Sequence, residues 1–257
     1  SVIDPRAAVD VAAELDEGVS VGPFAVIGPG VRIGRGTTIG PHAVIQGPTT
    51  IGADNRIFQF ASVGEAPQDK KYGGEDTRLE IGDRNVIREC ATVHRGTVQD
   101  EGVTRIGNDG LFMAYTHVAH DCRIGDHVIM ANGATLAGHV AIEDHVILGG
   151  FTLVHQFCSI GAHSFTAMGT AIGKDVPPYL MVSGNPAKPH GINAEGLKRR
   201  GFTAEQLKVL KAAYRVLYLS GLKLDEARLR LDEMSADAPD VARLAAFLVR
   251  SRRSIVR

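Results

Sequence analysis

Several of the ten histidines cluster in the middle of the chain, and one of them is followed directly by an aspartate. The pair is His120-Asp121, and His117 lies three residues before it. An imidazole titrates near neutral pH and can act as a general base. An adjacent carboxylate can orient the ring and stabilise its cation, as in serine hydrolases. The pair predicts general-base catalysis, although the spacing alone also fits histidines that simply lie exposed at a corner of the fold.

The segments that carry these residues follow a repeat of six. Large apolar side chains recur at every sixth position from Ile3 to Val63 and, after an interruption and a slip of one residue, from Ile106 to Ile172, with Thr166 as the exception. This period fits one short strand plus one turn rather than a helix or a simple strand. Fixed-period self-similarity is typical of solenoids. Three repeats therefore predict one 18-residue coil of a parallel β-helix.

Two further positions of the repeat are restricted. A small or β-branched residue lies four positions after the large one, as at Thr37 and Ala43, and we expect it to point inward as well. Glycine often follows the large residue directly, as in Ile33-Gly34, and we expect it to supply the positive φ of a tight corner. Each coil then buries its faces only against its neighbours.

An 18-residue coil brings distant histidines together, because residues one coil apart stack. His120 stacks on Gly138, the neighbour of His139, and two coils away on Gln156, the neighbour of His155. We therefore expect these side chains to line one edge of a three-sided prism.

A second set of histidines, His127, His145 and His163, is also spaced by 18 residues. All three occupy the same position of the repeat, and no carboxylate or cysteine arrangement completes a metal ligand set around them. We expect a solvent-exposed ladder here and no metal site.

Composition narrows the function classes. The chain has 28 basic and 29 acidic residues, which argues against general nucleic-acid binding. No apolar run reaches 18 residues and no signal peptide precedes Ser1, so we expect a cytoplasmic protein without a transmembrane segment.

Cys90, Cys122 and Cys158 are odd in number and lack metal spacing. We expect Cys122 and Cys158 to be small core residues in a reducing compartment.

Two polar segments leave the repeat, and the repeat itself ends well before residue 257. Residues 64–80 and 94–105 predict loops that protrude from the prism, where functional residues are common. A capping box at Thr203 opens a helical pattern. We therefore expect a mainly β protein, with a β-helix over residues 1–190 and a small C-terminal α-helical domain over residues 191–257.

Six segments spread over the chain resemble the UDP-N-acetylglucosamine O-acyltransferases of lipid A biosynthesis, a family of hexapeptide-repeat acyltransferases. They are Gln68–Tyr72, Val93–Gln99, His117–Asp121, Thr135–His139, Val154–Phe157 and Asn193–Phe202. The last segment lies outside the repeat, so it separates this family from other hexapeptide-repeat enzymes. The resemblance implies a left-handed parallel β-helix, and the handedness comes from it because periodicity alone cannot give a hand.

The resemblance also implies a reaction. His120, supported by Asp121, is expected to take the proton from the glucosamine 3-hydroxyl of UDP-N-acetylglucosamine. The hydroxyl oxygen then attacks an (R)-3-hydroxyacyl thioester on acyl carrier protein, and the backbone N–H of Gly138 is expected to stabilise the oxyanion. No metal, cofactor or covalent enzyme intermediate is implied. In this family the active site lies between adjacent subunits of a homotrimer.

Other positions are implied by the resemblance to be substrate contacts. The sugar would be held by Asp69 and Lys71. The cleft would be lined by His94, His117, His139 and Gln156. The uridine diphosphate side would be met by His155, Asn193, Glu195, Arg199 and Arg200, because guanidinium groups suit phosphate oxygens.

Two further features concern the acyl donor. Met168 aligns with the end of the family's acyl groove, where some members carry glycine. Overpacking a groove costs about 1–3 kcal/mol, so we expect Met168 to block it and to shorten the preferred chain to about ten carbons, unless the flexible side chain swings aside. The start of the helical domain has a basic face that includes Lys208, Lys211 and Arg215. This face either steers the acidic carrier protein or is only a solvated surface.

Three other interpretations stay open on the sequence. The sister N-acyltransferase of the same pathway shares the fold and the donor, but it normally has an extra N-terminal domain for which a repeat starting at Ile3 leaves no room. A γ-carbonic-anhydrase-like enzyme would bind zinc with histidines at subunit edges of the same prism. A non-catalytic β-helix would need a flat repetitive face, which the polar loops and the helical domain interrupt.

Overall fold

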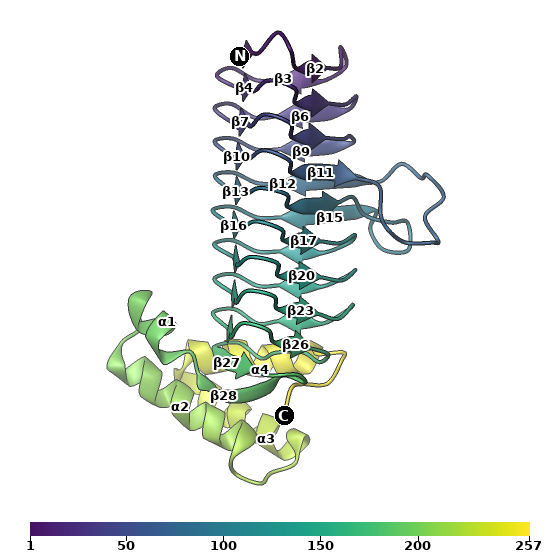
Figure 1. Cartoon of the computed structure of the whole chain (residues 1–257). Helices are drawn as coiled ribbons and strands as arrows, with labels where there is room; N and C mark the ends of the chain where they lie inside the picture. The colour runs from purple at the N-terminus through teal and green to yellow at the C-terminus, as the bar shows by residue number, and fades with distance from the viewer.

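Short parallel strands stack into a three-sided column that is followed by a group of helices (Figure 1). The computed structural model describes all 257 residues. The column is a left-handed parallel β-helix of hexapeptide repeats, as predicted, and the helices form a small C-terminal domain. Each coil contributes one strand to each of three sheets, which we call A, B and C.

The strands are two to five residues long, because each must end at a corner. Sheet A contains β1 (Val2–Ile3), β4 (Ser20–Val21), β7 (Thr38–Ile39), β10 (Arg56–Ile57), β13 (Val86–Ile87), β16 (Leu111–Phe112), β19 (Ile129–Met130), β22 (Ile147–Leu148), β25 (Phe165–Thr166), β27 (Leu180–Ser183) and β28 (Lys188–Ile192). Sheet B contains β2 (Ala8–Val9), β5 (Val26–Ile27), β8 (Val44–Ile45), β11 (Ser62–Glu65), β14 (Thr92–His94), β17 (His117–Val118), β20 (Thr135–Leu136), β23 (Leu153–Val154) and β26 (Ala171–Ile172). Sheet C contains β3 (Glu14–Leu15), β6 (Val31–Ile33), β9 (Thr49–Ile51), β12 (Arg78–Ile81), β15 (Val103–Ile106), β18 (Arg123–Ile124), β21 (Ala141–Ile142) and β24 (Ser159–Ile160).

The inside of the column is filled by the two inward positions of each repeat. Large residues stack in register from coil to coil, as in the pair Ile106 and Ile124, and nearly all of them are buried. Beyond the first coil, the small residues, including Thr37, are buried, and so are Cys122 and Cys158, as predicted. Thr166, the exception to the apolar rule, is buried too, and its hydroxyl lies 2.7 Å from that of Thr152. This hydrogen bond makes a polar residue tolerable in the core.

The corners adopt positive φ at a different position from the one predicted. Glycines that follow the large residue, such as Gly34, do not have positive φ, except Gly64 at the start of the first long connection. A Cβ on Gly34 would lie only 2.6 Å from the carbonyl carbon of Gly52, so glycine is required there by the close approach of the next coil. The positive φ falls three residues after the large one, and Asp54, Asp121 and His139 adopt it at 56°, 61° and 61°. Aspartate and histidine tolerate this conformation better than most residues.

Three corners run along the column, and each has one such position per coil. The A/B corner carries Phe24, His42, Phe60, Tyr115 and Phe151. The B/C corner carries Asp121, His139 and Phe157, and the C/A corner carries His127, His145 and His163. The expected catalytic residues and the second histidine set therefore lie on different edges of the prism.

Long connections interrupt the column at the B/C corner. One joins β11 to β12 and the other joins β14 to β15, and Figure 1 shows both as loops on the same side of the column. Arg95 ties them together, because its Nη1 donates to the carbonyl oxygen of Gly64 at 2.8 Å and its Nη2 to the hydroxyl of Tyr72 at 3.0 Å. The loops are thus bonded to each other and to the column.

The column ends in an antiparallel pair of strands, β27 and β28, and the C-terminal domain follows. Its helices are α1 (Ala194–Arg199), α2 (Ala204–Tyr218), α3 (Leu224–Met234), the short 3-10 helix η1 (Ser235–Asp237) and α4 (Pro239–Arg250). The capping box at Thr203 opens α2, as predicted, and α2, α3 and α4 pack around a buried apolar cluster that includes Leu217, Leu231 and Leu244. None of these helices has both the length and the apolar character that a membrane crossing requires.

Candidate active site

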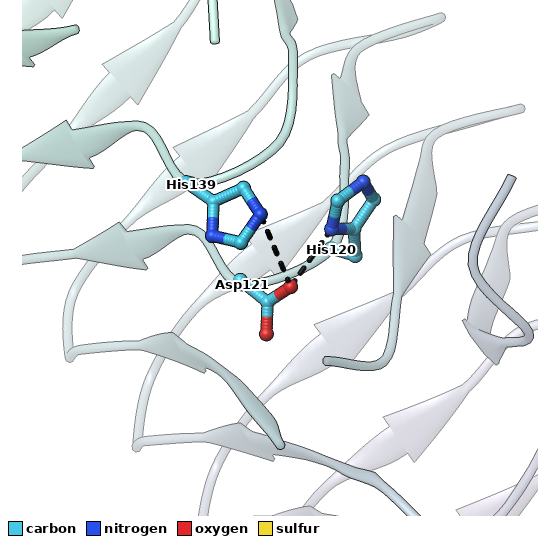
Figure 2. A group of neighbouring side chains, drawn as sticks. All are labelled: His120, Asp121 and His139. Atoms are coloured by element: carbon cyan, nitrogen blue, oxygen red, sulfur yellow. Dashed lines mark hydrogen bonds and ion pairs between the residues drawn. The ribbon is translucent and has the colours of Figure 1, made fainter. Parts of the chain in front are cut away.

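His120 and Asp121 lie at the turn between β17 and β18, on the B/C corner (Figure 2). The Nδ1–H of His120 donates to Oδ2 of Asp121 at 2.8 Å, which leaves Nε2 directed away from the carboxylate. Asp121 is buried, and burial alone would raise its pKa, but hydrogen bonds from His120 and Thr97 lower the pKa below the usual value. The structure therefore presents an imidazole that is oriented by an ionised carboxylate, and such an imidazole can accept a proton at Nε2.

Gly138 lies one coil beyond His120, and the ring of His120 covers it. A Cβ on residue 138 would lie 2.5 Å from Cε1 of His120, so only glycine leaves the ring in place. The corner turn also leaves the N–H of Gly138 without an acceptor in the protein. A free backbone N–H beside a base is the arrangement that an oxyanion hole needs.

His139 sits next to this pair and is held on several sides. Its Nε2 lies 3.7 Å from Oδ2 of Asp121, as Figure 2 shows, and its Nδ1–H donates to Oδ2 of Asp100 at 3.1 Å. Phe157 stacks on the ring with centroids 4.4 Å apart. The ring of His120 meets that of His139 edge-on.

His120, Asp121 and His139 are also close enough together to be considered as metal ligands, with candidate ligand atoms within 4.8 Å of one another. Nδ1 of His120 is engaged by Asp121, and both carboxylate oxygens of Asp121 accept hydrogen bonds, Oδ1 from Thr97 and Oδ2 from Thr97 and His120. Nδ1 of His120 and the carboxylate of Asp121 are thus used within the protein, and their geometry is that of a hydrogen-bonded dyad.

His94 and His117 extend the site toward the start of the column. Their rings meet edge-on with centroids 4.9 Å apart, and Nδ1 of His117 hydrogen-bonds to Oγ1 of Thr92 at 2.7 Å. Burial and the neighbouring His117 lower the pKa of His94 to about 4, and burial also lowers the pKa of His117. Both rings are therefore neutral at pH 7 and can donate or accept hydrogen bonds to a polar substrate.

The remaining expected contacts at this corner come from the first loop and from two coils further along. Asp69 and Lys71 lie in the loop between β11 and β12, where Oδ1 of Asp69 accepts a bond from the N–H of Lys71 at 3.0 Å. His155 and Gln156 are exposed in the coil of β23. Arg253, from the end of the chain, lies 3.3 Å from Nδ1 of His155, a neighbour that the sequence did not indicate.

The residues expected on the uridine diphosphate side, apart from His155, lie at a different corner. Asn193 caps α1 and donates to the carbonyl oxygen of His163, which belongs to the C/A corner. Glu195 pairs with Lys198 on the surface of α1, while Arg199 and Arg200 follow at its end. Nη1 of Arg200 is buried without a hydrogen-bond partner. Within one chain, the structure therefore does not bring this group to His120.

Two other expectations concern residues outside this corner. Met168 lies at the A/B corner and is 78% exposed. The second histidine set does stack, with centroids 4.7 and 4.8 Å apart, but a fully solvent-exposed ladder is wrong. Only His127 is exposed, because Tyr179 and Phe202 cover His163.

Sequence reasoning missed Thr97 and Asp100, both in the loop between β14 and β15. The N–H and hydroxyl of Thr97 donate to the two oxygens of Asp121 at 2.8 and 2.6 Å. The loop follows no repeat, so no register could place its residues against the corner. Two signals were available: both residues can form hydrogen bonds, and Thr97 lies in the segment Val93–Gln99 that carries the family resemblance.

Comparisons of the sequence and of the structure with known proteins all find similarity to the same group of acyltransferases. The family model described as UDP N-acetylglucosamine O-acyltransferase, domain 2, matches residues 175–256, and the bacterial transferase hexapeptide model matches residues 12–47 and 104–138. The chain is 58% identical to an acyl-[acyl-carrier-protein]–UDP-N-acetylglucosamine O-acyltransferase of Janthinobacterium sp. (strain Marseille), and 57% identical to one of Thiobacillus denitrificans, each over the full length of both proteins. It superposes on the crystal structure of the UDP-N-acetylglucosamine acyltransferase of Francisella novicida with a TM-score of 0.98 and 45% identity, covering 100% of this chain and 94% of the other. For the Arabidopsis enzyme the TM-score is 0.84 at 36% identity, with both chains fully covered.

Proposed function

The chain belongs to the UDP-N-acetylglucosamine O-acyltransferase family and is an acyltransferase, and from this premise we propose that it transfers an (R)-3-hydroxyacyl group from acyl carrier protein to the 3-hydroxyl of UDP-N-acetylglucosamine. This reaction would be the first step of lipid A biosynthesis, in the cytoplasm. The observation that carries the proposed mechanism is the 2.8 Å bond between Nδ1 of His120 and Asp121, which leaves Nε2 free to accept a proton.

Catalysis starts with removal of the sugar hydroxyl proton by Nε2 of His120. The hydroxyl oxygen attacks the thioester carbonyl, and the N–H of Gly138 stabilises the resulting oxyanion. Collapse of this intermediate breaks the carbon–sulfur bond, and His120 returns its proton to the departing thiolate of the carrier. A positioned base contributes roughly 10²–10⁴-fold and one oxyanion donor about 10²–10³-fold to such a reaction.

The sugar nucleotide is bound by residues from two corners. The loop with Asp69 and Lys71, together with the neutral rings of His94 and His117, holds the sugar next to His120. The diphosphate is met by His155 and by Arg199 and Arg200. The unpaired Nη1 of Arg200 supports this role, because a buried guanidinium N–H needs an acceptor.

A homotrimer explains why these groups lie on different edges of one chain. Sheet A has an apolar strip of outward residues in register, which consists of Val86, Leu111, Ile129, Ile147, Phe165 and Met181. Exposed apolar strips of this kind mark interfaces. If sheet A of one protomer packs against sheet B of the next around a threefold axis, the B/C corner of one meets the C/A corner of its neighbour. Each active site then combines His120 of one protomer with Arg200 of another.

The acyl donor reaches this interface from the outside. A chain that starts at His120 and crosses the outward face of sheet B arrives at the A/B corner, where Met168 lies exposed. We assign Met168 as the group that limits the chain to about ten carbons, because overpacking the groove costs about 1–3 kcal/mol.

The basic face of α2, with Lys211 and Arg215, would attract the acidic carrier protein. Salt should then slow turnover with a carrier-bound donor more than with a pantetheine thioester.

The deciding experiment is acyl transfer from carrier-bound 3-hydroxyacyl donors to UDP-N-acetylglucosamine, with His120→Ala as the test variant. Loss of roughly 10²–10⁴-fold in kcat supports the base assignment, and normal turnover by the variant would refute it. Transfer to the 2-amino group of UDP-3-O-acylglucosamine instead would identify the sister N-acyltransferase. Zinc-dependent hydration of carbon dioxide would identify the carbonic-anhydrase-like alternative.

A further inference from the structure

Asp100 lies in the loop between β14 and β15, and its carboxylate bridges two side chains of the column. Its Oδ2 accepts the bond from Nδ1 of His139 at 3.1 Å, and its Oδ1 accepts one from Nη2 of Arg123 at 2.8 Å. Partial burial would raise the pKa of Asp100, but His139 and Arg123 lower it, so the carboxylate is ionised at neutral pH. The loop thus places a second carboxylate beside a second histidine at the catalytic corner.

The anchor for Asp100 is a row of charges on the outer face of sheet C. Glu80, Arg105 and Arg123 occupy neighbouring strands in register. Glu80 pairs with Arg105, and Arg105 and Arg123 both pair with Glu101, the neighbour of Asp100. The row meets Asp100 directly through Arg123, and this bond does not depend on Glu101.

His139 is in turn fixed in orientation by three contacts. Phe157 stacks on its face, His120 meets it edge-on, and Asp100 accepts from Nδ1. Only the bond to Asp100 distinguishes one flip state of the ring from the other, because stacking does not select a ring nitrogen. With Nδ1 bound to Asp100, Nε2 faces Asp121 at 3.7 Å.

We propose that Asp100 is a positioning residue for the acyl transfer, which acts by holding His139 with Nε2 toward the Asp121–His120 pair. Two carboxylate–histidine pairs then share one corner: Asp121 orients His120, and Asp100 orients His139. The inference rests on the proposed function, since it assigns Asp100 to the same reaction. It adds a residue that neither the repeat nor the resemblance assigned to the site.

Glu101 provides a matched control. It is the adjacent residue of the same loop and pairs with Arg123 and Arg105, but the ion pair with Nδ1 of His139 is made by Asp100 and not by Glu101. Asp100→Ala and Glu101→Ala therefore both remove a carboxylate from the charge row, and only Asp100→Ala frees the histidine. Asp100→Asn keeps an acceptor oxygen for Nδ1–H and should restore much of the function.

The test compares kcat and KM of the three variants with carrier-bound donor and UDP-N-acetylglucosamine, and the His139 ring in crystal structures of the two alanine variants. We expect Asp100→Ala to lower kcat roughly 10- to 100-fold, because a displaced group near the reacting atoms has effects of this size. KM should change less than twofold, the ring should turn, and Glu101→Ala should resemble the wild type.

Three results would overturn the inference. They are equal losses in Asp100→Ala and Glu101→Ala, a change confined to KM, or an unmoved His139 ring in the Asp100→Ala structure. Thermal unfolding of all variants separates these outcomes from misfolding. If His120→Ala retains activity, the proposed function fails instead; if His120→Ala is inactive while Asp100→Ala is normal, only the role of Asp100 fails.

Discussion

The hydroxyl of Thr97 lies 2.6 Å from Oδ2 of Asp121, and the N–H of Thr97 lies 2.8 Å from Oδ1 of the same carboxylate. Both donors belong to the loop between β14 and β15, and Thr97 precedes Asp121 by 24 residues in the sequence. The N–H of Asp121 in turn donates to Oγ1 of Thr104 at 2.8 Å. The loop therefore fixes the carboxylate on which the orientation of His120 depends.

Thr97→Val should lower kcat/KM by roughly tenfold. It removes the hydroxyl donor and keeps the shape, and a hydrogen bond to a charged group contributes about 1.5–3 kcal/mol, where 1.36 kcal/mol in the barrier is tenfold. Thr37→Val is the control, because Thr37 is also buried and hydrogen-bonded but lies far from the site along the column. Steady-state kinetics and thermal unfolding of both variants check this. A similar kinetic loss in Thr37→Val would mean that Thr97 acts only through stability.

The column could be predicted from the sequence because its period is set by packing alone. Each coil must bury one large and one small side chain, so the strands, the buried cysteines and the stack of His120 on Gly138 follow from counting. The predicted reason for the corner glycines was wrong. In a sequence, a glycine that is required by close approach of backbones, as at Gly34, looks the same as a glycine that is required for positive φ. The contacts of Thr97 and Asp100 could not be predicted, because a loop without a period has no register.

The environment of His163 makes stability sensitive to acid. Its ring lies between those of His145 and Tyr179, and burial together with His145 and Arg200 lowers its pKa from 6.5 to about 4. Because the folded state resists protonation of His163, the contribution of its neutral ring to the free energy of unfolding is complete above pH 6.5. This contribution is lost as the pH falls toward 4. The full shift corresponds to roughly 3 kcal/mol.

His163→Phe should therefore reduce the loss of stability between pH 6.5 and about 4, while keeping the aromatic stack. The measurement is the midpoint of thermal unfolding across this range. His127→Phe serves as the control, because His127 is exposed and belongs to the same stack. The idea fails if both variants have the acid sensitivity of the wild type. His94, whose pKa is also lowered to about 4, accounts for part of the sensitivity that remains.

Met168→Gly should shift the preferred acyl chain toward longer donors. Removing the side chain frees the space of several methylene groups, and each buried methylene is worth about 0.8 kcal/mol. Rates with a panel of carrier-bound 3-hydroxyacyl donors measure the shift. Met168→Leu keeps a side chain of similar volume and should keep the original preference. An unchanged profile in Met168→Gly would show that the methionine swings aside.

The separation of His120 and Arg200 on two corners leads to the sharpest test of the assembly. His120→Ala and Arg200→Ala should each yield homotrimers of very low activity, since every site lacks either the base or a diphosphate contact. In mixed trimers from co-expression, some sites combine His120 of one protomer with Arg200 of the next. For a heterologous ring of three and random 1:1 mixing, about a quarter of the sites are intact. Activity should therefore recover to about a quarter of the wild-type value. If both residues served one site within a single chain, no mixture would recover activity, and the arrangement of sheet A against sheet B would have to be abandoned.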